Sequence, residues 1–188
     1  MSAKQAGQPH AERIARDAPD YPPVLLARLG AEAPEELVVL GRRELLGAHK
    51  TALFCSARTP GHAILRAHDA ARRMRERGVT VISGFHSPIE KECLRILLRG
   101  TQALIVCPAR GIEALRIPSE LQAALAAGRL LFLSPFTTPV KRITRESAVR
   151  RNQIVTALAD DAFLAYVSPG GETERVAHLL AAWNVPLV

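Results

Sequence analysis

Short apolar runs alternate with amphipathic segments along most of this 188-residue chain. Between residues 61 and 77, apolar side chains recur at spacings of three and four, as on one face of an α-helix, and Gly78 follows where that helix would end. The runs between such segments are mostly apolar and rich in Val, Ile, Leu and Phe, as in strands buried on both faces. The alternation predicts right-handed crossovers and an α/β fold, a three-layer Rossmann-like domain with a mostly parallel sheet.

The expected elements follow from these runs and from the glycines and prolines between them. Residues 1–20 are polar with little periodicity, so we expect a flexible N-terminal arm, followed by one domain over residues 21–188 whose core begins at about residue 37. We expect strands at 53–55, 79–82, 103–106, 130–133 and 162–167, and helices at 61–77, 88–99, 118–127, 150–158 and 173–183.

Composition argues against a membrane-spanning or secreted protein and against a disulfide framework or metal site. No apolar run approaches the roughly 20 residues that a membrane helix needs, and the first 20 residues lack the apolar stretch of a secretory signal, so we expect a cytoplasmic protein. Cys55, Cys93 and Cys107 show no CxxC spacing, which argues against a disulfide framework and against a metal site. We expect no metal and no cofactor. The formal net charge of +7 favours an anionic partner, although charge alone is a weak indicator of nucleic-acid binding.

Candidate binding residues follow the predicted strands, where an open parallel sheet places its ligands. After the strand at 53–55, Ser56 and Arg58 could bind a phosphate, although Thr59 could equally act as a plain helix cap. After the strand at 79–82, Gly84 permits close approach of the backbone and His86 could reach a ligand. The alternative there is a surface histidine beside a capping Ser87.

The loop at 168–174 carries the most specific local signal. Its two glycines and a threonine, directly before a predicted helix, would offer free backbone N–H groups and the positive end of a helix dipole to an anion. Thr173 acting as a simple cap is the alternative. The residues that we assign to phosphate or nucleotide binding are Ser56, Arg58, Ser83, Gly84, His86, Gly170, Gly171 and Thr173.

A basic segment precedes the helix expected at 150–158. From this segment into the first residues of that helix, five basic residues stand against the single acidic Glu146, in a stretch that we expect to be an irregular connection ending over the strand exits. A solvated charged face is the ordinary alternative. We assign no catalytic residue. The residues that we assign to nucleic-acid binding are Lys141, Arg142, Arg145, Arg150, Arg151 and Asn152.

Several motifs, taken in order, resemble those of the DNA-processing protein A (DprA/Smf) family. They are Tyr21-Pro22-Pro23, the strand-like run 36–41, the turn 55–58, the segment 83–90, the run Arg151-Asn152-Gln153-Ile154-Val155 and the glycine-rich turn 168–173. The resemblance implies a Rossmann-like domain that binds single-stranded DNA through phosphate contacts, with roles in DNA uptake, recombination or transformation. It also implies a homodimer and a recombinase partner. Ala57 and Ser87 depart from the family's basic positions, and its YP..N motif is absent.

A second, more distant resemblance is to the LOG phosphoribohydrolases, which suggests a nucleoside monophosphate hydrolase as an alternative. It rests on Arg150-Arg151, on 161–164 and on Pro169-Gly170-Gly171. Val176 stands where that pattern has its catalytic glutamate, so we expect no efficient hydrolysis of the glycosidic bond. A domain that senses a mononucleotide is a further alternative.

Overall fold

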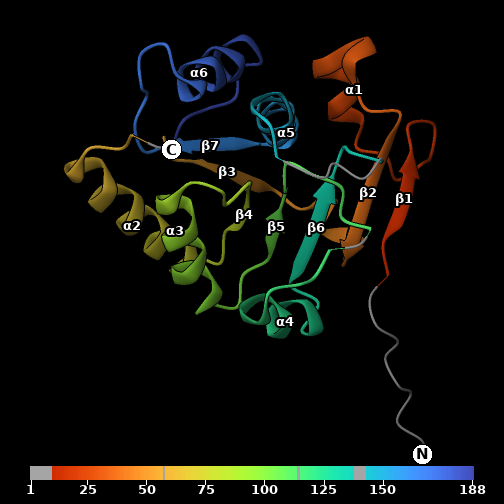
Figure 1. The fold of residues 1–188 in the computed structure, drawn as a ribbon, viewed down its shortest axis with the longest axis horizontal. Coiled ribbons are helices and arrows are strands. Elements are labelled where there is room, and N and C mark those ends of the chain that lie inside the picture. Colours follow the sequence, from red (N-terminus) through yellow and green to blue (C-terminus); the bar gives the residue numbers. More distant parts are fainter. Residues whose placement is uncertain (1–9, 57, 114, 138–142) are drawn as a thin grey trace, which may run out of the picture.

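The computed structural model describes residues 10–188, apart from residues 57, 114 and 138–142. Its centre is a seven-stranded sheet in the order β1-β2-β6-β5-β4-β3-β7, flanked by helices on both faces (Figure 1). This confirms the Rossmann-like α/β class expected from the sequence. The strands are β1 (Glu12–Ala15), β2 (Glu36–Gly41), β3 (Lys50–Phe54), β4 (Thr80–Ser83), β5 (Leu104–Val106), β6 (Leu130–Ser134) and β7 (Asp161–Leu164).

The helices divide between the two faces of the sheet. In Figure 1, α1, α5 and α6 lie on one face, and α2, α3 and α4 lie on the other. The helices are α1 (Pro23–Leu29), α2 (Gly61–Glu76), α3 (Pro88–Leu98), α4 (Ser119–Ala126), α5 (Arg145–Leu158) and α6 (Glu172–Ala182), with short 3-10 helices at Gly30–Glu32 and Arg43–Gly47.

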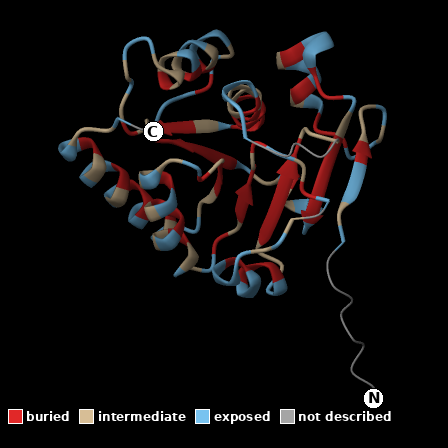
Figure 2. Cartoon of the chain, viewed as in Figure 1, coloured by how far each residue is buried: buried red, intermediate tan, exposed pale blue. Residues whose placement is uncertain are grey.

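Side chains of each strand point alternately into two separate cores. In β2, Leu37 and Val39 pack in the core beneath α1, α5 and α6, whereas Val38 and Leu40 pack in the core beneath α2, α3 and α4. This is the two-residue period of an extended chain with both faces covered. Figure 2 shows the result, with the central strands mostly buried, the edge strand β1 largely exposed and the helices exposed on their outer faces. Every residue of β3 and β6 is buried, and the apolar residues 52–54 and 130–133 in them follow from the same double coverage.

Strand β3 marks the point where the sheet reverses its order. It pairs in parallel with β4 on one side and with β7 on the other. The loop after β3 leads to α2 on one face, and the loop after β7 leads to α6 on the opposite face. Because these two loops diverge, they leave a crevice beyond the carboxyl ends of β3 and β7, which is where ligands bind in sheets of this type.

The N-terminal part of the chain differs from the sequence prediction. Residues 12–15 lie within the expected flexible arm, yet they form β1, which pairs antiparallel with β2 at the edge of the sheet. Only Ile14 of this strand is buried, so the segment lacks the apolar run from which a strand would be predicted. Strand β2 also runs antiparallel to β6, and the parallel part of the sheet therefore begins at β6.

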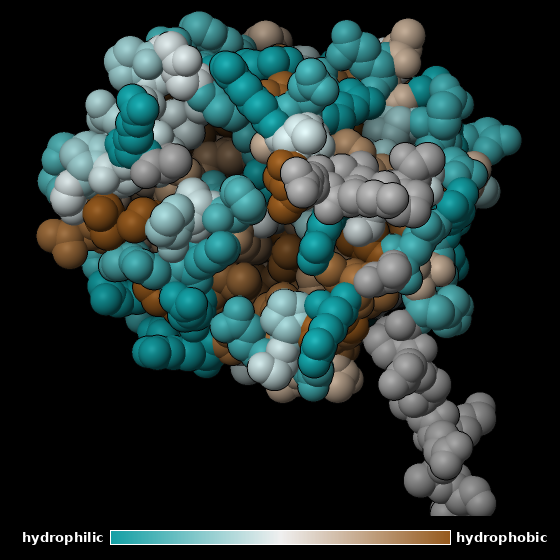
Figure 3. All heavy atoms as spheres, viewed as in Figure 1, coloured by the Kyte–Doolittle hydropathy of each residue, from teal (hydrophilic) through white to brown (hydrophobic). Residues whose placement is uncertain are grey.

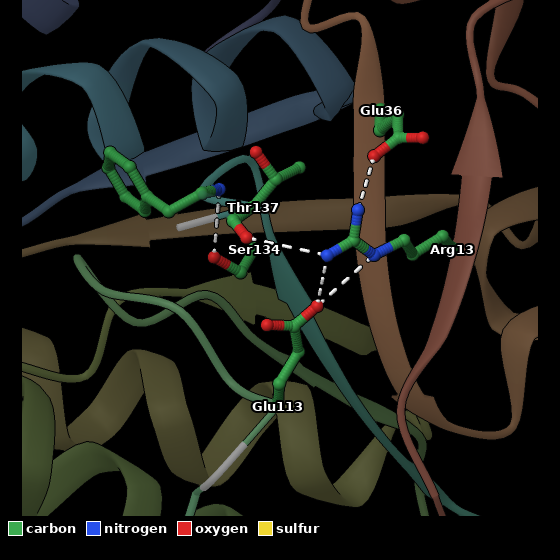
Figure 4. A network of polar contacts seen from close by, with 6 residues as sticks. Arg13, Glu36, Glu113, Ser134 and Thr137 are labelled. Atoms are coloured by element: carbon green, nitrogen blue, oxygen red, sulfur yellow. Dashed lines mark hydrogen bonds and ion pairs between the residues drawn. The ribbon is translucent and has the colours of Figure 1, made fainter. Parts of the chain in front are cut away.

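Arg13 connects β1 to the loops that follow β5 and β6 (Figure 4). Its guanidinium lies 3.0 Å from a carboxylate oxygen of Glu36 and 2.6 Å from one of Glu113. The hydrogen bond and charge of Glu113, together with the charge of Glu36, raise the pKa of Arg13. Ser134 joins the same two loops, because its hydroxyl donates to the carbonyl of Arg110 at 2.8 Å and accepts from the N–H of Phe136.

Helix α5 begins earlier than predicted. The sequence suggested an irregular basic connection before residue 150, but residues 145–158 are helical. Thr144 and Ser147 cap this helix reciprocally through side chain and backbone, which fixes its first turn. Arg145, Arg150 and Arg151 therefore project from a helix. Lys141 and Arg142, which were assigned to the same surface, lie outside the described residues.

Among the described residues, no helix combines the length and apolar character that crossing a bilayer requires. The same residues contain no group of three or more His, Cys, Asp or Glu side chains arranged to hold a metal ion. The three cysteines are free thiols and all are buried.

Gly41 at the end of β2 provides a test of the sheet geometry. Its φ is 113°, and a Cβ there would overlap the carbonyl oxygen of Leu130 and lie 2.8 Å from a methyl group of Leu125. We expect Gly41→Ala to lower the free energy of unfolding by about 3 kcal/mol, measured by urea denaturation.

Gly78→Ala is the matched control. Gly78, just after α2, also has a positive φ, 69°, but a Cβ added there would meet no heavy atom within 4 Å. The change should cost about 1 kcal/mol, the ordinary cost of the left-handed backbone alone. Equal effects of the two substitutions would contradict close approach at Gly41.

Candidate functional site

The crevice beyond β3 and β7 contains a cavity of about 460 Å³. Its walls come from the loop after β3, the loop after β4, the middle of α5 and the loop that opens α6. Eight of the residues assigned from the sequence line this one cavity: Ser56, Arg58, His86, Arg151, Asn152, Gly170, Gly171 and Thr173.

Glu90 fixes the shape of the first two loops. One carboxylate oxygen accepts from the N–H of Cys55 at 3.1 Å, and the other accepts from the N–H groups of His86 at 2.9 Å and Ser87 at 3.1 Å. Ser87 in turn accepts from the N–H of Glu90, which completes a capping box at the start of α3. The predicted cap at Ser87 is confirmed. The sequence showed Glu90 only as part of a motif and gave no indication that it links two strand exits.

The loop after β3 closes on itself. Ser56 accepts from the N–H of Arg58 at 3.2 Å, and the hydroxyl of Thr59 donates to the carbonyl of Ser56. Thr59 is therefore not the cap of α2, whose N-cap is Pro60 without a side-chain hydrogen bond. The side chain of Arg58 is left exposed at the mouth of the cavity.

Arg151 is the central cation of the site. Although only 4% of its surface is exposed, it has no carboxylate within ion-pair distance in the described chain. Its Nη1 donates to the carbonyl of Cys107 at 3.1 Å, and its Nε donates to Oδ1 of Asn152 at 2.7 Å. A guanidinium has five N–H groups, and these two hydrogen bonds use two of them, which leaves three without an acceptor in the described chain.

Gly84 makes the position of Arg151 possible. A Cβ on Gly84 would overlap the guanidinium of Arg151, so only glycine lets the arginine side chain cross the end of β4. From the sequence we expected a ligand to approach this glycine closely, whereas in the structure the close neighbour is the side chain of Arg151. Ser83 is also displaced from its expected role, because it is fully buried and its hydroxyl accepts from the N–H of Phe85.

The two glycine N–H groups of the loop before α6 are already hydrogen-bonded within the protein, whereas the sequence predicted that they would be free. The N–H of Gly170 donates to a carboxylate oxygen of Glu174, and the N–H of Gly171 donates to the carbonyl of Ser168. Thr173 accepts from the N–H of Ser168 and is not the cap of the helix, whose N-cap is Gly171. The amides left for an anion are those of the first turn of α6, not those of the two glycines.

The acidic residues near this loop are already engaged. Glu172 accepts from the side-chain amide of Asn152 at 3.3 Å, and Glu174 accepts from the backbone of Gly170. Val176, at the position of the hydrolase glutamate, is 1% exposed and packs in the core.

Two buried thiols lie beside the cavity. Hydrogen bonding to Cys93 and burial both raise the pKa of Cys55. Burial raises the pKa of Cys107 to about 12, although the charge of Arg151 acts in the opposite direction. Both groups therefore remain protonated at neutral pH, and neither offers a thiolate nucleophile.

A second cavity, of about 440 Å³, lies on the other side of Arg151. It shares His86 and Arg151 with the first cavity, and its floor includes the apolar side chains of Phe85, Val106 and Phe132. Figure 3 shows a hollow near the centre of the face in view, with hydrophobic residues at its floor and hydrophilic residues around it.

The rim of this second cavity is basic. Lys91 and Arg95 project from one face of α3, Arg110 follows β5, and Glu120 is the one acidic residue that lines the cavity among those described. Arg110 was noted in the sequence as part of a strand exit. Lys91 and Arg95 were missed, although their spacing of four residues on a predicted helix would have placed them together.

Two assigned residues point elsewhere. Arg145 and Arg150 line a groove between α5 and α6 that is continuous with the first cavity through Gly170 and Gly171. Arg150 is partly held by Gln153, which accepts from its Nη1 at 2.8 Å. These two arginines therefore border the site and do not face into it.

Two of the solved structures compared share this fold. DNA processing protein A from Helicobacter pylori superimposes with a TM-score of 0.74 at 17% identity, covering 94% of this chain and 79% of that one. DNA processing protein A from Streptococcus pneumoniae gives 0.67 at 16% identity, covering 94% and 70%. The molybdenum cofactor carrier protein from Chlamydomonas reinhardtii gives 0.47 at 14% identity, covering 74% of each chain.

A sequence search of curated proteins finds no match. The family model described as DNA recombination-mediator protein A, however, matches residues 12–169, which include every strand of the sheet and the cavity loops as far as Pro169. The match confirms the resemblance seen in the sequence motifs, and the chain belongs to the DNA recombination-mediator protein A family.

Proposed function

We propose that this domain binds single-stranded DNA through its phosphate backbone, with one phosphate held by Arg151 in the β3–β7 crevice. The observation that carries the proposal is the buried guanidinium of Arg151, which has no carboxylate partner among the described residues and lines both cavities. Burying an unpaired cation is costly unless an anion joins it. Family membership supports DNA as the source of that anion, and the Helicobacter pylori relative is described as binding single-stranded DNA.

The neighbouring cavity suggests where a base would lie. Its apolar floor, with Phe85 and Phe132, offers a surface for a nucleobase next to the phosphate at Arg151. Its basic rim, formed by Lys91, Arg95 and Arg110, would meet the phosphates on either side. A single strand has bases free to enter such a cavity, whereas bases in a duplex are already paired and stacked.

Charge around the site favours a strand that is long enough to reach the rim. Arg58 lies at the mouth of the first cavity, and Arg145 and Arg150 line the adjoining groove. Each exposed arginine adds a weak, salt-sensitive contact to a phosphate. A mononucleotide would use Arg151 alone, so we expect oligonucleotides to bind more tightly than nucleoside monophosphates do.

Replacement of Arg151 tests the central contact. We expect Arg151→Ala to weaken binding of a labelled single-stranded oligonucleotide about tenfold, or about 1.4 kcal/mol. The slope of log K against log salt should fall by about 0.7, the value for one phosphate contact on a single strand. Fluorescence anisotropy at several salt concentrations measures both quantities, and circular dichroism reports whether the variant folds.

Arg66→Ala is the control for that experiment. Arg66 is exposed on α2, and its loss changes the net charge by the same amount. If both variants bind equally well, general charge attraction accounts for binding, and the proposed contact at Arg151 is wrong.

Gly84→Ala tests the same contact without removing a charge. The added methyl group would occupy the space of the Arg151 guanidinium and force it out of the wall between the two cavities. We expect a loss of affinity similar to that of Arg151→Ala. Gly61→Ala should leave affinity unchanged, because no heavy atom lies within 4 Å of a Cβ at Gly61.

An abasic strand tests the second cavity. We expect it to bind at least fivefold more weakly than a thymidine oligonucleotide of the same length, because base stacking contributes roughly 1–3 kcal/mol per base. The salt dependence of the two strands should match, since their phosphates are the same. Equal affinities would remove the base from the proposal and leave the phosphate contact standing.

A further inference from the structure

Glu172 brings a negative charge to the same crevice in which Arg151 is the central cation. Both residues line the first cavity. Glu172 is half-buried and is the first residue of α6, where the positive end of the helix dipole stabilises a carboxylate. The two charges form no ion pair within the described residues, and each is hydrogen-bonded instead to the side chain of Asn152.

The side-chain amide of Asn152 lies between these two charges. Its Oδ1 accepts from Nε of Arg151 at 2.7 Å, and its Nδ2 donates to Oε1 of Glu172 at 3.3 Å. A guanidinium can only donate and an ionised carboxylate can only accept, so the two partners determine which end of the amide faces which charge. Asn152 therefore satisfies both groups and adds no charge of its own to the site.

Glu172 is the carboxylate in the cavity that could compete with a ligand for Arg151. The other carboxylate of the lining belongs to Glu90, and three backbone N–H groups hold it in place. Glu172 accepts a single side-chain hydrogen bond in the described chain, the one from Asn152. Loss of that hydrogen bond would leave Glu172 free to turn toward the guanidinium.

We infer that Asn152 is a positioning residue, which keeps Arg151 available to a phosphate by holding Glu172 apart from it. The inference rests on the proposed function, in which Arg151 binds a phosphate of single-stranded DNA. Charges in a partly buried site attract each other more strongly than charges in water. An ion pair between Glu172 and Arg151 would therefore compete directly with the phosphate, and the neutral amide prevents it.

Two simpler roles for Asn152 lead to different expectations. The residue could contact DNA directly, as the sequence suggested, or it could orient Arg151 through the hydrogen bond to Nε alone. In either case, loss of the amide would weaken DNA binding, and the charge of Glu172 would make no difference to the loss. Separation of the two charges predicts instead that binding returns when the charge of Glu172 is removed.

A double-mutant cycle on the full chain distinguishes these roles. Fluorescence anisotropy with a labelled single-stranded oligonucleotide compares the unchanged protein with Asn152→Ala, with Glu172→Gln and with the double variant. We expect Asn152→Ala to weaken binding about fivefold, because Glu172 then competes for Arg151. Adding Glu172→Gln should restore the affinity to within about twofold of the unchanged protein. An undiminished affinity of Asn152→Ala, or a loss that Glu172→Gln does not restore, would overturn the inference.

Glu146→Gln is the matched control for charge. Glu146 is exposed in the first turn of α5, and its replacement changes the net charge by the same amount as Glu172→Gln. Combined with Asn152→Ala, it should leave the loss of affinity in place. Equal restoration by the two glutamine substitutions would mean that general charge attraction explains the recovery, and the inference would be wrong.

Urea denaturation tests the separation without DNA. In the Asn152→Ala background, Glu172→Gln should lower the urea midpoint, because it removes the new ion pair with Arg151, whereas it should leave the midpoint of the unchanged protein nearly the same. High salt should reduce the difference. Equal midpoint shifts in the two backgrounds would overturn the inference even where Arg151→Ala weakens DNA binding. Undiminished DNA binding by Arg151→Ala would instead reject the proposed phosphate contact, so the two failures are distinguishable.

Discussion

The carboxylate of Glu90 holds together the two loops on which the crevice depends. It accepts from three backbone N–H groups, one after β3 and two after β4, while only 7% of its residue surface is exposed. A buried charge is tolerated when such charge-assisted hydrogen bonds satisfy it, and its place in the first turn of α3 adds the favourable end of the helix dipole. Glu90 therefore links the two loops directly, in addition to the pairing of β3 with β4, and holds them in place at the edge of the cavity.

Arg151 has the opposite character, because the protein leaves its charge incompletely compensated. The side chain crosses Gly84 and donates to the carbonyl of Cys107 and to Asn152, which orient it without neutralising it. A carboxylate partner would have stabilised Arg151 by Coulomb attraction. The arginine would then have lost its capacity to bind an anion. Glu90 and Arg151 both line the cavity, but the carboxylate of Glu90 is hydrogen-bonded to three backbone amides, whereas Arg151 has no anionic partner in the described chain. This arrangement suits the site to a negatively charged ligand.

The fold was largely predictable because its strands are buried on both faces and therefore appear as continuous apolar runs between helical segments. The cap at Ser87 was predictable from a local pattern. The direction of β2 was not, because a local pattern carries no information about the neighbouring strand. The first turns of α5 are polar and partly exposed, so the sequence there shows no apolar residues at helical spacing from which a helix could be predicted. The sequence placed most of the cavity residues at strand exits, but the burial of Arg151 depends on a glycine far away in the chain.

The two ends of a parallel sheet offer different chemistry, and this chain uses residues suited to each. Beyond the carboxyl ends, loops run into helix N-termini, so amides and a buried arginine meet there and favour anions. At the amino ends, Lys50 binds one of two consecutive aspartates, and the other retains an unused acceptor. The strands β3 and β7 connect these ends, and both are packed against helices along their length. Helix α2 begins after the loop that follows β3 and ends beside the amino ends of the strands, so it is the helix that spans from one end of the sheet to the other.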